Sequence, residues 1–125
     1  MKKYEKRIEG SKISFWDLGA EVFWIDERLL EDRKAVEVRL GGNLRADSVH
    51  EFKTEMEKFL AVGYGIVLEL SEVTNLSIAY MHEFVHIQQT VEAKDGLFLE
   101  LKNLSGEARK ALFSRGIHAL LAVQD

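Results

Sequence analysis

The sequence predicts an α/β domain with a partly parallel sheet. Two observations lead to this fold class. Apolar residues recur at two-residue spacing in some segments and at helical spacing in others, and the two kinds of segment alternate from residue 35 onward. Turn residues, mostly glycine, separate them. A chain of 125 residues without an evident linker is expected to form one domain, residues 1–125.

The first part of the chain is expected to supply antiparallel strands. Residues 1–20 are interpreted as an N-terminal extension, in which residues 13–16 form an edge strand. Residues 21–25 are rich in aromatic and β-branched side chains and predict the next strand. The charged run at residues 31–34 predicts a hairpin turn.

A strand–helix–strand unit follows. Apolar and charged residues alternate between residues 36 and 40, which indicates a half-buried strand that ends at Gly41-Gly42. Apolar residues between positions 49 and 60 recur at helical spacing. Residues 66–70 form an apolar run that predicts a central buried strand. The unit is long enough for a right-handed crossover between parallel strands.

A second unit repeats this order. Residues 78–93 predict a helix whose apolar stripe consists of Met81, Phe84, Val85 and Val91. Residues 97–101 predict the next strand. Ser105 is placed to cap a last helix over residues 107–114, and residues 117–123 are expected to form a short closing element.

The composition disfavours several functional classes. Cysteine is absent, so disulfides, cysteine-ligated zinc and thiol catalysis are excluded, and a reducing, cytoplasmic location is expected. The net charge of −4 argues against general nucleic-acid binding, which needs a basic face. No apolar run approaches the ~18 residues that cross a bilayer, so no membrane partner is expected. Nothing indicates a cofactor, and the oligomeric state stays open.

The segment His82-Glu83-Phe84-Val85-His86 matches the H-E-x-x-H pattern of zinc proteases. On a helix, the two histidines face the same way and could hold one zinc ion, with Glu83 as the general base. However, no histidine follows at the spacing of a third ligand, and the sequence selects no carboxylate in its place. A chance match on an ordinary helix is the main interpretation, and a small zinc-dependent hydrolase that uses His82 and His86 is an alternative.

Several landmarks between residues 35 and 121 occur in the order of a known family. Asn43-Leu44-Arg45 follows a strand that ends in glycine, and residues 66–73 give an apolar strand followed by a Leu-Ser-x-Val loop. Residues 76–81 form a loop-to-helix junction, and residues 108–117 give a matching C-terminal helix. In these features the chain resembles the STAS family, the sulfate-transporter and anti-sigma-factor-antagonist domain.

The resemblance implies a STAS fold, which is a mixed, partly parallel sheet with helices packed mainly on one face. It also implies a non-catalytic protein-interaction module. Bacterial members of this type bind an anti-sigma-factor kinase, which phosphorylates the first serine of an Asp-Ser-Ser-Gly motif and so releases the complex. This chain has Ser77-Ile78-Ala79-Tyr80 at that motif. Isoleucine cannot accept phosphate, so the usual serine switch is predicted to be lost.

Two nearby hydroxyls could replace the missing acceptor. Ser77 and Thr74 lie one and four positions before Ile78. The main interpretation of Ser77 is an N-cap, whose hydroxyl accepts a hydrogen bond from a free backbone N–H group. Tyr80 stands where the family has glycine, and its ring is explained either by a reshaped loop or by contact with a partner.

The sequence therefore predicts an anti-sigma factor antagonist that binds a protein partner of the anti-sigma type. The residues expected at this interface are Asn43, Leu44, Arg45, Thr74, Asn75, Ser77, Ile78, Ala79 and Tyr80. Besides the zinc-dependent hydrolase, a third possibility is a small-molecule- or nucleotide-sensing STAS domain that uses the same loops.

Overall fold

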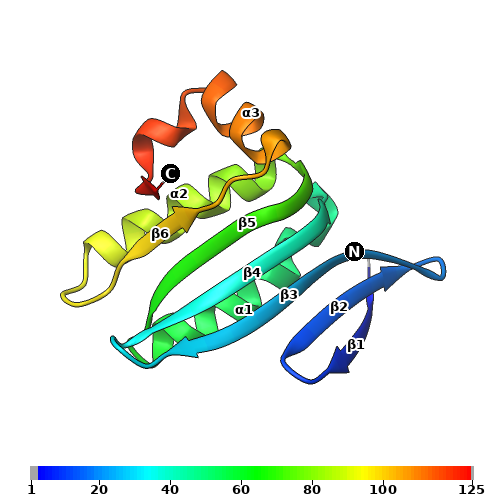
Figure 1. Ribbon diagram of the computed structural model, residues 1–125, viewed down its shortest axis with the longest axis horizontal. Helices are drawn as coiled ribbons and strands as arrows, with labels where there is room; N and C mark the ends of the chain where they lie inside the picture. The colour runs from blue at the N-terminus through cyan, green and yellow to red at the C-terminus, as the bar shows by residue number, and fades with distance from the viewer. Residues whose placement is uncertain (1–2, 125) are drawn as a thin grey trace.

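The computed structural model describes residues 3–124, which form a seven-stranded mixed sheet with three α-helices (Figure 1). The strands are β1 (Glu5–Glu9), β2 (Lys12–Asp17), β3 (Ala20–Leu30), β4 (Ala35–Leu44), β5 (Gly65–Leu76), β6 (Leu99–Lys102) and β7 (Val123–Gln124). The helices are α1 (Val49–Ala61), α2 (Ile78–Glu92) and α3 (Gly106–Ser114), with 3-10 turns at Ala46–Ser48 and Ile117–Leu120.

The strands lie in the sheet in their order along the chain. Neighbours from β1 to β4 are antiparallel, and neighbours from β4 to β7 are parallel. The parallel half arises because α1, α2 and α3 each carry the chain back before the next strand begins. Both α1 and α2 cover the same face of the sheet, and α3 packs against β5 (Figure 1). The predicted α/β class, the mixed sheet and the placement of the helices are confirmed.

The face of the sheet opposite α1 and α2 has charged side chains that alternate in sign from strand to strand. One row across the sheet pairs Glu9 with Lys12, Lys12 with Asp26, Asp26 with Arg39, Arg39 with Glu69 and Glu69 with Lys102. Within it, Arg39 Nε donates to Glu69 Oε2 over 3.0 Å. Opposite charges in neighbouring strands attract one another, so this face remains favourable in water without a covering helix.

The β4 strand differs from its prediction in two ways. It is buried on both faces, because Arg28 and Lys102 form salt bridges with Glu37 and cover its carboxylate. It also continues through Gly41-Gly42 to Leu44. A Cβ atom at Gly41 would lie 2.1 Å from Cε2 of Trp24, so this glycine makes room for an indole ring rather than ending the strand.

The β5 strand also exceeds its predicted length. Pairing with β4 continues past two register shifts until Leu44 lies opposite Leu76. The resemblance to the STAS family predicts a Leu-Ser-x-Val loop from Leu70, and most side chains after Leu70 are polar. Those side chains are exposed at the end of a strand whose backbone is still paired, so the loop prediction is wrong.

The N-terminal segment is part of the sheet. The strand predicted at residues 13–16 is confirmed as β2, but β1 lies outside it and forms the edge. The ring of Phe15 stacks on Phe23, with their centroids 4.5 Å apart, so β2 continues the core. Nothing in the β1 sequence predicts a strand, because every side chain from Glu5 to Glu9 is exposed.

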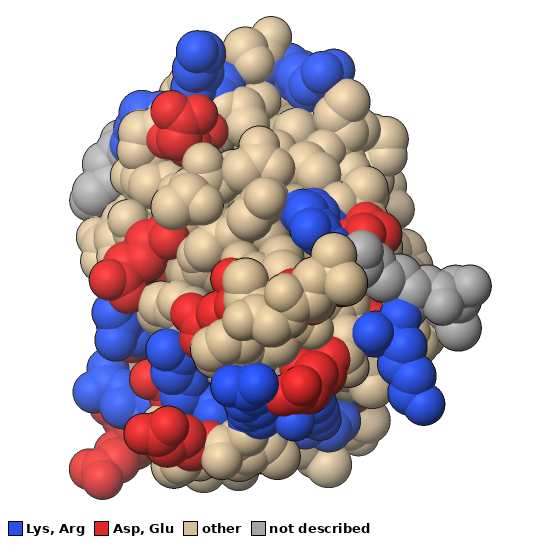
Figure 2. Space-filling view, turned by 90° about the vertical axis from the view of Figure 1, so that its right-hand side faces the viewer, with Lys and Arg blue, Asp and Glu red and all other residues tan. Residues whose placement is uncertain are grey.

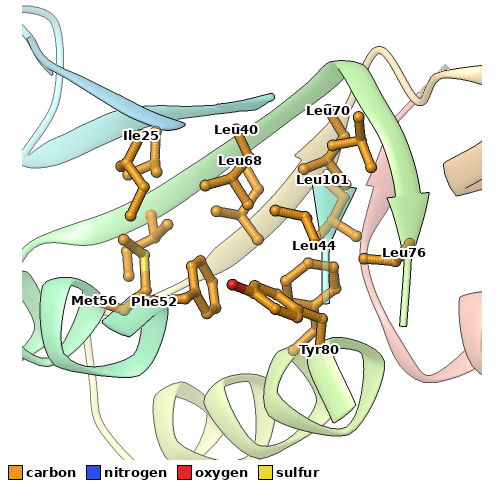
Figure 3. Packing of buried hydrophobic residues seen from close by; sticks show 14 of the residues in the cluster. Ile25, Leu40, Leu44, Phe52, Met56, Leu68, Leu70, Leu76, Tyr80 and Leu101 are labelled. Atoms are coloured by element: carbon orange, nitrogen blue, oxygen red, sulfur yellow. The ribbon is translucent and has the colours of Figure 1, made fainter. Parts of the chain in front are cut away.

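The core lies between the sheet and the two covering helices (Figure 3). From the sheet, Leu40, Leu68 and Leu101 point toward α1 and α2 (Figure 3). From the helices, Phe52 and Tyr80 meet them with ring centroids 5.4 Å apart. The side chains of the α2 stripe are Tyr80, Met81, Phe84, Ile87 and Val91; Val85 of the predicted stripe is only partly buried.

Two carboxyl groups meet between β3 and α1. Burial, and then a hydrogen bond and charge repulsion with Glu55, raise the pKa of Glu27 to about 7. Burial acts against the ionised form of Glu55 too, but hydrogen bonds from Lys58 and Glu27 hold the pKa of Glu55 below its usual value. Lys58 Nζ lies 2.6 Å from Glu55 Oε2, and Lys6 lies on the other side at 3.6 Å. The proton of the pair therefore resides on Glu27.

This pair predicts a pH dependence of stability. Glu27 keeps its proton up to about pH 7 when folded and loses it near pH 4.5 when unfolded, so the folded state binds the extra proton between these values. The free energy of unfolding should therefore decrease as pH rises through this window. In Glu27→Gln, melting temperatures at pH 5 and pH 8 should differ less than in the wild type. Glu57→Gln, a substitution at an exposed position of α1, should keep the wild-type difference in melting temperature between pH 5 and pH 8. If Glu27→Gln kept that difference too, the assignment of the proton to Glu27 would be contradicted.

Candidate functional site

The carboxyl ends of β4 and β5 bring the two predicted interface segments together. Ser77 N donates to the carbonyl oxygen of Leu44 over 3.1 Å. Asn75 Nδ2 donates to Asn43 Oδ1 over 2.9 Å. The chain enters α2 directly after this contact, and it enters α1 through a single 3-10 turn. Residues 43–45 and 74–80 thus form one continuous region at this edge of the sheet.

Uncharged side chains form the exposed part of this region. Ile78 is the first residue of α2, and 41% of its surface is exposed. Thr74 and Asn75 are exposed beside it, and Ala79 is partly exposed. The helix α2 therefore begins with an apolar side chain that the rest of the described chain leaves in contact with solvent.

Ser77 occupies the N-cap position of α2 but does not cap the helix. Its side chain accepts no hydrogen bond from the helix backbone. Its Oγ atom is buried and has no hydrogen-bond partner among the described residues. The N-cap interpretation of its hydroxyl is therefore wrong, although the residue's position is as predicted. In this structure the hydroxyl is also inaccessible to an enzyme.

The prediction that Leu44 and Tyr80 belong to an exposed binding surface is wrong. The side chains of both are fully buried. The Tyr80 phenol hydrogen-bonds with Ser48 Oγ over 2.8 Å and donates to the Ser48 carbonyl over 3.2 Å. Burial raises the pKa of this phenol above its ordinary value, so it stays protonated. The ring fills the space between the sheet and Phe52 (Figure 3), where the family's glycine would place no side chain.

Arg45 is held by hydrogen bonds within its own chain. Its guanidinium lies 3.1 Å from Asp17 Oδ2, 3.3 Å from Asp47 Oδ2 and 2.7 Å from the Tyr4 hydroxyl. The bonds with Asp17 and Tyr4 raise the pKa of Arg45 above its ordinary value. Burial and the hydrogen bond with Asp47 raise the pKa of Tyr4 to about 12. Arg45 thus connects the β2–β3 turn to the interface region, a contact that the sequence did not reveal because its partners lie far apart along the chain.

The H-E-x-x-H residues lie on the outer surface of α2. His82 and His86 are exposed, and His86 Nδ1 lies 3.5 Å from Glu83 Oε2. Glu83 and His86 line a shallow hollow of about 270 Å³ between α1 and α2. Within residues 3–124, no group of three histidine or carboxylate side chains is placed to hold a metal ion. The two histidines therefore lack the third ligand that catalytic zinc requires.

Comparison with known proteins decides the family. The family model described as Mlab, STAS domain, matches residues 28–122. The chain belongs to the STAS family. A comparison with curated proteins finds no match. Among the residues that the structure describes, no helix has the length and apolar character needed to cross a membrane.

Solved structures of other proteins share the fold of this STAS domain. The NMR structure of the protein TM1081 has a TM-score of 0.67 and 22% identity, covering 79% of this chain and 78% of that one. The structure of the anti-sigma factor antagonist SpoIIAA, in its unphosphorylated form, has a TM-score of 0.66 and 17% identity, covering 81% of this chain and 88% of that one. The crystal structure of a candidate anti-sigma factor antagonist from Thermotoga maritima has a TM-score of 0.64 and 21% identity, covering 81% of this chain and 86% of that one.

Within the STAS domain, a second hollow lies next to the altered motif. It measures about 320 Å³ and is lined by Ser77, Ile78 and Met81 of the α2 end and by Lys110 and Arg115 of the α3 region. The Ser77 hydroxyl is inaccessible, so the hollow presents the exposed Ile78 side chain beside the two cations.

Proposed function

We propose that this STAS domain is a non-catalytic interaction module of the anti-sigma factor antagonist type. Its contact surface consists of Asn43, Arg45, Thr74, Asn75, Ile78 and Ala79 at the carboxyl ends of β4 and β5. The observation that carries the proposal is the exposed apolar Ile78 at the first position of α2, in a fold shared with the anti-sigma factor antagonist SpoIIAA. A protein partner would bury this side chain and gain the hydrophobic free energy.

Binding of this kind is not switched off by a kinase at the usual position. Ile78 has no hydroxyl, and the neighbouring Ser77 hydroxyl is buried. Thr74 is exposed, but it lies near the end of strand β5 rather than at the start of α2. A phosphate on Thr74 would not benefit from the free N–H groups at the helix N-terminus. The complex would therefore be constitutive with respect to serine phosphorylation.

The test measures phosphate transfer to this region. The wild-type protein and an Ile78→Ser variant are incubated with each anti-sigma-factor kinase of the source organism and ATP, and phosphate is located by mass spectrometry. We expect no phosphate on Ser77 or Thr74 of the wild type, and phosphate on residue 78 of the variant, because only there does a hydroxyl stand exposed at the helix start.

Two results would contradict this proposal. Stoichiometric phosphate on wild-type Ser77 would show that the switch has moved rather than been lost. Stoichiometric zinc in the purified protein, absent from a His86→Ala variant, would favour the hydrolase instead. A His50→Ala variant serves as a matched control, because His50 is also exposed but lies on α1.

A further inference from the structure

The turn between β2 and β3 presents the most exposed large apolar side chain among the described residues. Asp17 pairs with Ala20, so Leu18 and Gly19 form a two-residue hairpin turn. Leu18 is 98% exposed. Nothing within the described chain packs over it, so its apolar surface contributes nothing to the core.

The backbone at this turn disfavours leucine. Leu18 has a φ of +53° and Gly19 a φ of +78°. Two consecutive residues with positive φ are the mark of the turn type that best fits the twist of a hairpin, and asparagine or aspartate followed by glycine is the preferred sequence there. Leucine at the first position is therefore explained neither by the turn nor by the core.

The turn lies at the same edge of the sheet as the proposed contact surface. Because β3 runs antiparallel to β4, the start of β3 lies beside the end of β4, where Phe23 pairs with Gly42. The salt bridge between Asp17 and Arg45, 3.1 Å long, fixes the turn against the 43–45 segment. The position of Leu18 relative to Ile78 is therefore set by the fold rather than by a free loop.

Uncharged exposed residues lie at the turn and at the start of α2, with charged residues beside them. The uncharged residues are Leu18, Ala20, Ala46, Thr74, Asn75 and Ile78; Glu21 and Asp47 are exposed beside the turn, and Lys110 and Arg115 lie beside Ile78. Figure 2 looks onto the end of the molecule where the β2–β3 turn lies, and shows uncharged residues in its lower half surrounded by charged residues of both signs. A partner that fits this surface presents an apolar recess for Leu18 with a polar rim around it.

We infer that the β2–β3 turn is part of the partner interface and that Leu18 is its apolar anchor. This inference rests on the proposed function, and it extends the contact surface to the N-terminal hairpin, which precedes the residues that match the STAS model. The occupant is the same protein partner, whose recess would receive Leu18 while Ile78 packs nearby. Anchors of this kind contribute a large share of the binding free energy of an interface.

The substitution Leu18→Asn is expected to weaken binding of the partner without destabilising the fold. Asparagine suits the turn better than leucine, so the melting temperature is expected to stay the same or to rise. Affinity for the anti-sigma-factor kinase that binds the wild type, measured by calorimetry, is expected to fall by about tenfold or more. Leu29→Asn is the matched control, because Leu29 is also exposed but lies at the opposite end of β3. The Leu29→Asn variant should bind the kinase with the affinity of the wild type.

The possible results are distinct. Affinity unchanged in Leu18→Asn but lost in Ile78→Glu would overturn the anchor while leaving the proposed function intact. No binding of the wild type to any kinase of this class would overturn both. Sedimentation of the wild type as a dimer and of Leu18→Asn as a monomer would also overturn the inference, because the turn would then contact a second copy of the chain.

Discussion

Ile78→Glu is expected to weaken binding of the protein partner by about 30- to 1000-fold, or ~2–4 kcal/mol. The side chain is 41% exposed at the first residue of α2, where a partner would bury it. A partner that covers this position would remove water from the carboxylate, and the apolar contact made by isoleucine would be lost. The affinity of the purified complex, measured by calorimetry or surface plasmon resonance, checks this expectation.

The fold should tolerate the same change. An acidic side chain in the first turn of a helix interacts favourably with the helix dipole, so Ile78→Glu should leave the melting temperature near that of the wild type or raise it slightly. Ile78→Val is the matched control, since it keeps an apolar side chain of similar shape and should retain most of the affinity. Equal affinities of wild type and Ile78→Glu would remove Ile78 from the interface.

The central part of the fold could be predicted because its periodicities are strong. From Val36 to Leu112, apolar residues at two-residue or helical spacing identify strands and helices in their correct order. The exact ends were less accurate, because polar residues after Leu70 still pair through their backbones. A strand defined only by backbone pairing, such as β1, has no side-chain pattern that a single sequence could show.

The proximity of the two proposed interface segments was predicted, but their side-chain contacts were not. The segments around Asn43 and Ile78 were expected to meet, and they do. The contacts of Arg45 with Tyr4 and Asp17 span 41 and 28 residues, and no local pattern encodes such pairs. Two side chains assigned to the surface are buried instead, because the alignment with a loop motif says nothing about the space beneath that loop.

Tyr80 shows which signal was available. It precedes Phe84 by one helical turn, and the series continues through Ile87 and Val91 on the same face of α2. The helical spacing alone would place the ring in the core, although the predicted stripe did not include Tyr80. The family motif placed the residue at a glycine position near the surface. Where the two disagreed, the periodicity was the better guide, since it reports the direction in which a side chain points.

Tyr80→Ala is therefore expected to have the largest effect on stability, a loss of about 3–5 kcal/mol in the free energy of unfolding. The ring is fully buried and contacts Phe23, Phe52 and Phe84, with centroid distances of 6.4, 5.4 and 6.5 Å. Its removal leaves a cavity between the sheet and the helices and deprives Ser48 of a hydrogen-bond partner. Chemical denaturation followed by circular dichroism measures the loss.

Tyr80→Phe separates the two contributions of the side chain. It keeps the ring and removes only the hydroxyl, so the expected loss is about 1–2 kcal/mol, from the hydrogen bonds with Ser48. Because the hydroxyl is buried, affinity for the protein partner should not change in Tyr80→Phe. A fall in affinity with little loss of stability would instead mean that the ring turns outward in the complex, and that the core of this STAS domain rearranges when the partner binds.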